Sequence, residues 1–272
     1  GQGKIVAWTH RIVGQGILAS SPLKGRVKDG LDPTVLKGAY NLPYGFAAQT
    51  VDVHMPDLPV PVLWWRSVAS SHNAYAVETF IDQIAAAAGR DPAELRLELL
   101  AGRERHLAVL RLVLDKAGWT KPLAQGAPSE KRGRGLALHE SFDSVVAQVA
   151  EVSIKPDGSF SVDRVVCAVD CGIAINPDVV RAQMEGGIGY GLSAALTGAI
   201  TFNKGRVEQS NFHDYAVLRM PQMPKVEVHI VPSTAPPSGV GEPGLPPIAP
   251  AVANALAMAG ARRITSLPIK LS

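Results

Sequence analysis

The chain has 272 residues, of which 46% are hydrophobic and 19% charged, a composition typical of a folded protein and unlike that of a disordered one. Its net charge of +3 is small, and Lys and Arg are interspersed with Asp and Glu, which argues against nucleic acid as a partner. No apolar run approaches the ~18 residues of a membrane-spanning helix.

The first half of the chain is predicted to form two strands followed by three helices. The opening residues already resemble a strand, without a start Met or a signal-peptide pattern, so the chain is expected to begin in mid-fold. The strands are expected at residues 4–13 and 50–54, and the helices at 73–88, from Asp91 onward and at 104–117. Asp91 followed by Pro92 is a typical helix start, and Gly118 is a typical stop.

The second half follows a polar segment, residues 121–131, that is expected to be a linker. Strands are predicted at 135–139, 145–154, 161–169 and 226–231, and helices at 178–196 and 247–259. Residues 155–158, with the sequence KPDG, are typical of a hairpin turn. Because strands and helices mix without regular alternation, the sequence predicts an α+β fold in two mixed subdomains, residues 1–130 and 131–272.

Two cysteines, Cys167 and Cys171, are too few for a disulfide framework or for an iron–sulfur cluster with four thiolate ligands. They flank three residues of an apolar, strand-like run. We therefore expect buried core thiols, with a redox pair as the alternative.

Glu242 lies in the most informative segment, residues 238–250, which have the sequence SGVGEPGLPPIAP. The glycines let the backbone pass close to a bulky group, and a carboxylate held on such a turn has the fixed geometry that a general base needs. The alternative from spacing alone is a surface loop whose acid caps the helix that follows.

Two further segments contain residues that suit ligand binding. Residues 182–191, AQMEGGIGYG, place Gln183 beside four glycines, which indicate either close helix packing or the approach of a ligand. Residues 64–73, WWRSVASSHN, place Arg66 and two serines before a helix N-terminus, where anions such as phosphate bind. Plain helix capping by Ser71 and Asn73 is the alternative for this segment.

Other catalytic and metal motifs are weak or absent in the sequence. His139-Glu140 and His213-Asp214 lack zinc-ligand spacing, and no nucleophile elbow, Walker loop or Rossmann fingerprint occurs. A carboxylate pair such as Asp170 and Glu242 would suit a glycosidase, if the fold brought the two side chains together.

Taken together, the three segments resemble the molybdenum hydroxylases, the family of xanthine dehydrogenase, aldehyde oxidoreductase and their bacterial relatives. SGVGEPGLPPIAPAVANAL resembles the family's C-terminal GVGEP signature, and VDCGIAINPDVVRAQMEGGIGYGLSAAL is similar to its INP…QxEGG segment. LWWRSVASSHNAYAVETFIDQIA matches its arginine-led turn. The sequence is most similar to the isoquinoline 1-oxidoreductase beta subunit group, in which WRSVG, HESFxSxVAQVAEV and QSNFHDYxVLRM occur in this order. The resemblance covers residues 4–271, as the C-terminal portion of a molybdopterin-binding subunit.

The resemblance implies an oxidoreductase whose molybdenum is held by molybdopterin, in bacteria usually as the cytosine dinucleotide. It implies that Glu242 is the general base that deprotonates a molybdenum-bound hydroxyl derived from water, and that substrates are aldehydes or N-heteroaromatic compounds. No side chain is expected to ligate the metal. The cofactor-binding residues it implies are Arg66, Ser67, Val68, Ala69, Ser70, Ser71, Gln183, Gly186, Gly187, Gly239, Val240 and Gly241.

The sequence also departs from the family pattern. Ala69 stands where close relatives have glycine, and the GGGFG stretch and a GQG stretch that embrace the cofactor lack counterparts, since Gly14-Gln15-Gly16 is expected to be a strand end. The resemblance therefore implies three partners: the remainder of the molybdopterin-binding subunit, an iron–sulfur subunit and a cytochrome c subunit. A non-catalytic scaffold half-domain is the alternative. A periplasmic or membrane-associated location is favoured over a cytoplasmic one.

Overall fold

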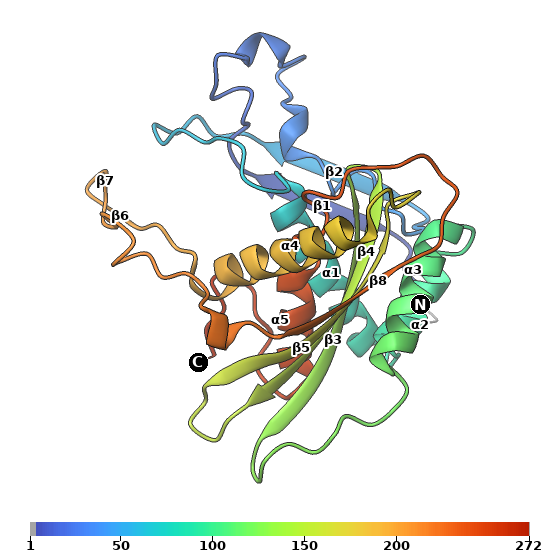
Figure 1. Cartoon of the computed structure of the whole chain (residues 1–272). Helices are drawn as coiled ribbons and strands as arrows, with labels where there is room; N and C mark the ends of the chain where they lie inside the picture. The colour runs from blue at the N-terminus through green and yellow to red at the C-terminus, as the bar shows by residue number, and fades with distance from the viewer. Residues whose placement is uncertain (1–3, 272) are drawn as a thin grey trace.

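The computed structural model describes residues 4–271, and its centre is a four-stranded sheet of order β3-β4-β5-β8 (Figure 1). The sheet comprises β3 (Lys131–Ser141), β4 (Ser144–Ile154), β5 (Phe160–Asp170) and β8 (Lys225–Ile230). The first three strands are antiparallel, and β8 is parallel to β5. The turn predicted at residues 155–158 joins β4 to β5, with Gly158 in the left-handed region at a φ of 83°.

Both faces of the sheet are covered by helices, which explains why β4 is buried over almost its whole length. Because side chains alternate along a strand, Val145, Ala147 and Val149 face one core, whereas Val146 and Ala150 face the other. The first core lies under α2 (Pro92–Leu99) and α3 (Glu104–Ala117), and the second under α4 (Pro177–Thr197) and α5 (Ile248–Met258). In Figure 1, these two helix pairs lie on opposite sides of the sheet.

Helix α5 packs directly on β3 because two glycines of that strand leave room for it. A Cβ atom on Gly135 would lie 2.2 Å from the backbone nitrogen of Ala255, and one on Gly133 would lie 2.0 Å from the Ala255 carbonyl oxygen. Helix α1 (Ser70–Ala87) contacts both α5 and β3. The segment before α5 carries Glu242, so this packing fixes the position of that loop on the sheet.

The remaining elements lie at the periphery. Strands β1 (Trp8–Val13) and β2 (Gln49–His54) form a parallel pair, and β6 (Phe202–Asn203) and β7 (Arg206–Val207) form a small hairpin that projects from the molecule (Figure 1). Short 3-10 helices are formed by Lys24–Arg26, Pro33–Val35 and Met220–Gln222. Within residues 4–271, no helix is long and apolar enough to cross a membrane.

The predicted α+β class is confirmed, and most elements lie where the sequence placed them. The first strand begins at Trp8 rather than at residue 4, and β3 begins at Lys131, within the predicted linker. Both cysteines are buried and free, as expected. The proposed boundary at residue 130 falls just before β3, but helices from the first half cover one face of the sheet from the second. The division into two subdomains stays a prediction.

Candidate functional site

The three segments singled out in the sequence meet in space at the side chain of Arg66. Its Nε donates a 2.8 Å hydrogen bond to the carbonyl oxygen of Gly241, which the Nη2 group also contacts. The same Nη2 lies 3.2 Å from Oε1 of Gln183 on α4. One guanidinium therefore joins the segment before α1, the glycine-containing helix α4 and the loop before α5.

Glu242 is held by the residue that follows Arg66. The backbone N–H of Ser67 donates to Oε1 of Glu242 at 2.7 Å, and the Ser67 hydroxyl donates to the Glu242 carbonyl oxygen at 2.7 Å. Ser67 itself is buried, whereas Glu242 is partly exposed. The candidate base is therefore anchored at one carboxylate oxygen and at its own backbone.

The Ser67 amide points at Glu242 because the backbone takes an unusual path. Ser67 and Val68 have φ values of 72° and 49°, in the left-handed region that costs non-glycine residues of order 1–3 kcal/mol each. Such a conformation persists where surrounding contacts enforce it, and the bonds to Gly241 and Glu242 are contacts of this kind.

The loop that carries Glu242 is also held by contacts with β4 and α4. Gln148, fully buried on β4, donates from Nε2 to the Gly244 carbonyl oxygen at 2.7 Å. Gly187 of α4 packs on the same loop, because a Cβ atom there would lie 3.0 Å from the Gly244 carbonyl carbon. A Cβ on Gly244 would in turn lie 3.0 Å from the Cα of Met184. Helix packing thus accounts for Gly187.

Two other glycines leave open space beside the carboxylate. A Cβ on Gly241 would meet no atom within 4 Å, and one on Gly186 would meet only the Arg66 Nη1 at 4.0 Å. The Arg66 guanidinium carbon lies over the ring of Tyr190, 5.9 Å from the ring centroid. The ring centroids of Tyr190 and Trp65 are 5.1 Å apart. A cavity of about 620 Å³ opens here, lined by Trp65, Glu185, Gly186, Tyr190 and neighbouring residues.

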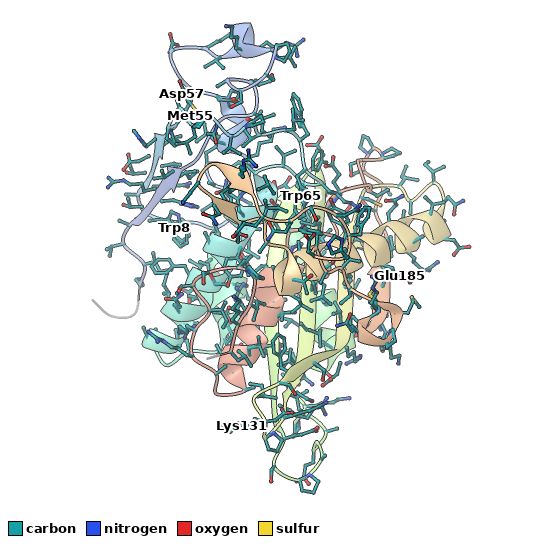
Figure 2. All side chains as sticks on the ribbon, turned by 90° about the vertical axis from the view of Figure 1, so that its left-hand side faces the viewer. Trp8, Met55, Asp57, Trp65, Lys131 and Glu185 are labelled. Atoms are coloured by element: carbon teal, nitrogen blue, oxygen red, sulfur yellow. The ribbon has the colours of Figure 1, made fainter. Side chains whose placement is uncertain are left out.

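Figure 2 shows Trp65 and Glu185 near the middle of the molecule, whereas Lys131 marks the far end of the sheet. The cavity borders the Arg66 side chain through Gly186 and Tyr190, which line it.

The remaining predicted site residues have local roles in the structure. Helix α1 begins at Ser70 after an Ala69 without a capping side chain, so capping by Ser71 and Asn73 is wrong. Asn73 lies in the first turn of α1, and its Nδ2 donates to the carbonyl oxygens of Val35 and Lys37. Residues Gly239 and Val240 lie in the loop that leads to Glu242.

The alternative chemistries find little support in residues 4–271. They contain no cluster of three or more His, Cys, Asp or Glu side chains that could hold a metal ion. Asp170 is bound by Arg105, with Nε 2.9 Å from Oδ2. Burial alone would raise the pKa of Asp170, but the hydrogen bonds from Arg105 and Gly172 lower it, whereas a glycosidase acid needs a raised pKa.

The residues present leave room for a large cofactor. Open glycine backbone at Gly186 and Gly241 leaves room for a large group next to Glu242.

Comparisons with known proteins show to which family the chain belongs. A family model for the molybdopterin cofactor-binding domain matches residues 75–224. The beta subunit of isoquinoline 1-oxidoreductase from Brevundimonas diminuta is 38% identical over 85% of this chain and 29% of that protein. A nicotinate dehydrogenase subunit from Pseudomonas putida is 32% identical over 84% of this chain and 20% of that protein. The structure of quinoline 2-oxidoreductase from Pseudomonas putida 86 matches with a TM-score of 0.80 at 12% identity, over 98% of this chain and 59% of that one.

The family match, over more than half of the chain, identifies a molybdopterin cofactor-binding domain. The chain belongs to the molybdopterin cofactor-binding domain family, within the molybdenum-binding subunits of the xanthine dehydrogenase-type hydroxylases, as the resemblance predicted. It spans less than a third of the length of the two relatives.

Two side chains of this site were missed in the sequence. Gln148 carried a signal, since an amide in the otherwise apolar run VVAQVA needs a buried partner. Tyr190 carried none, because an aromatic residue at that spacing on a helix is equally typical of a packing position.

Proposed function

We propose that this chain completes the active site of a molybdenum-dependent oxidoreductase that hydroxylates N-heteroaromatic compounds or aldehydes, with water as the source of oxygen. The observation that carries the proposal is Glu242, which is anchored through Oε1 by the Ser67 amide beside open glycine backbone. The names of two relatives, which refer to isoquinoline and nicotinate, favour an N-heteroaromatic substrate, whereas another relative, 32% identical, is named as an aldehyde dehydrogenase.

In this proposal, Glu242 is the general base, and its carboxylate takes one proton from the attacking group as the oxygen is transferred. A molybdenum–molybdopterin held beside Gly186 and Gly241 would supply the oxygen nucleophile and the two-electron acceptor. Gly186 and Gly241 would lie against the cofactor, with Gln183 supplying amide hydrogen bonds. Arg66 keeps the Gly241–Glu242 segment next to α4.

The rest of the assembly is proposed on the same basis. The cofactor is expected as the cytosine dinucleotide, and the electrons are expected to leave through iron–sulfur clusters on a partner subunit and then a cytochrome c subunit. The remainder of the molybdopterin-binding subunit would close the other side of the cofactor.

The test is Glu242→Gln in the complete, cofactor-loaded enzyme, because the amide keeps the size of the side chain but accepts no proton. We expect unchanged molybdenum per protein and a turnover lowered by at least ~10²-fold, the usual loss for a missing general base. Glu208→Gln, at an exposed glutamate of the projecting hairpin, is the matched control and should keep wild-type turnover.

Turnover of Glu242→Gln within tenfold of wild type would refute the assignment of the base. Molybdenum far below one atom per assembly in the wild-type protein would instead favour a scaffold.

A further inference from the structure

The two oxygens of the Glu242 carboxylate are not equivalent. Oε1 accepts the Ser67 amide at 2.7 Å, and the Glu242 carbonyl oxygen accepts the Ser67 hydroxyl. Both bonds come from a single residue whose amide direction depends on a left-handed backbone at Ser67 and Val68. The orientation of the carboxylate is therefore set by the path of the chain just after Arg66.

Arg66 forms hydrogen bonds to protein oxygens on the loop that carries Glu242 and on α4. Its Nε and Nη2 both donate to the Gly241 carbonyl oxygen, one residue before Glu242, and Nη2 also faces the Gln183 side-chain and backbone oxygens. The Tyr190 ring lies under the guanidinium. A planar group with several donors in fixed directions suits this arrangement, whereas a lysine ammonium offers a single point of charge.

We propose that Arg66 is a positioning residue for Glu242: through Nε and Nη2 it holds Gly241 against α4, so that the Ser67 amide occupies Oε1 of Glu242 and Oε2 is the oxygen that accepts the proton. The proposal rests on the proposed function of Glu242 and assigns to Arg66 a role other than the cofactor binding that the family resemblance implied. These bonds occupy Nε and Nη2, whereas Nη1 lies next to Gly186, on the side proposed for the cofactor.

The experiment uses Arg66→Lys and Arg66→Met in the complete enzyme, with molybdenum content, kcat and KM measured for each. Arg181→Lys is the matched control, since Arg181 is an exposed arginine of α4 that pairs with Asp178. We expect molybdenum content equal to wild type, KM within threefold, and kcat lower by about 10–100-fold, as follows from a base displaced by roughly 1 Å.

A double-mutant cycle with Glu242→Gln separates positioning from a general structural effect. Because Arg66 acts through Glu242, Arg66→Lys should lower kcat less than threefold in the Glu242→Gln background. Loss of molybdenum or of folding in both Arg66 variants would overturn the proposal, as would an undiminished effect in the double variant.

The failure of this inference is distinguishable from that of the proposed function. An active Glu242→Gln enzyme would end the assignment of the base itself. An inactive Glu242→Gln enzyme together with a fully active Arg66→Lys enzyme would overturn only the role of Arg66.

Discussion

Two adjacent glycines of α4, Gly186 and Gly187, should respond to alanine in opposite ways. Both lie inside the helix, where glycine is less favourable than alanine by about 1 kcal/mol, so alanine gains that amount at either position. At Gly186 the new methyl group would meet only one atom, at 4.0 Å. At Gly187 it would meet three backbone atoms of residues Gly244 and Leu245 at 3.0–3.2 Å.

The difference between the two variants isolates the packing of α4 on the loop that carries Glu242, because the gain in helix propensity is common to both. An extra methyl group in a site that is already closely packed lowers the free energy of unfolding by typically ~1–3 kcal/mol. We therefore expect Gly186→Ala to be more stable than wild type by about 1 kcal/mol, and Gly187→Ala to be less stable than Gly186→Ala by about 1–3 kcal/mol.

Urea titration of the purified, cofactor-free protein measures both free energies of unfolding, and molybdenum content after loading gives the second readout. If Gly186 lies against the cofactor, Gly186→Ala should bind less molybdenum in spite of its greater stability. Equal stabilities of the two alanine variants would refute the packing role of Gly187, and full molybdenum content in Gly186→Ala would refute its place at the cofactor.

Two further predictions concern buried charge. Arg96→Met leaves Glu78 and Asp82 buried without their cation and should lower the free energy of unfolding by about 3–5 kcal/mol. The control Arg90→Met, at a partly exposed ion pair, should lower it by less than about 1 kcal/mol. Equal losses of unfolding free energy in urea titrations of the two variants would contradict this prediction. Burial lowers the pKa of His139 from 6.5 to about 4, so protonation favours the unfolded chain. The free energy of unfolding should therefore be unaffected by His139 above pH 6.5 and fall as the pH drops towards 4. The loss at pH 4 should be roughly 3 kcal/mol, and His139→Gln should flatten this part of the pH–stability profile; an unchanged slope would count against the assignment.

The elements that the sequence located well are those with local signals. Helix α3 ends at Gly118, which has a φ of 62°, and α2 begins with Asp91, whose side chain accepts from two backbone amides. The start of α1 was placed late because its first turn has no capping side chain. The hairpin of β6 and β7 escaped detection, since two-residue strands have no periodicity to recognise.

The sequence indicated Glu242 as a site residue but not the contacts that hold it. Glycine spacing around Glu242 indicated a backbone that something approaches, and the family resemblance supplied its role. The bonds from Ser67 to Glu242 join residues 175 positions apart, and no local pattern encodes such a pairing. The same separation hides the contact of Arg66 with Gly241. The sequence therefore suggested an anion site at a helix N-terminus, where the structure has an arginine bound to the loop that carries Glu242.

Ala69 illustrates how the structure changes the meaning of a departure from the family pattern. A glycine in its place would suggest a tight turn or a close approach, yet Ala69 has a right-handed φ of −68° and a buried methyl group. The left-handed residues are the two before it, Ser67 and Val68. Alanine at position 69 is therefore compatible with the turn, and its low backbone freedom helps α1 to begin immediately after the strained pair. The rigidity of the site thus comes from helix α1 on one side and the Arg66 clamp on the other, with the Ser67 amide held between them.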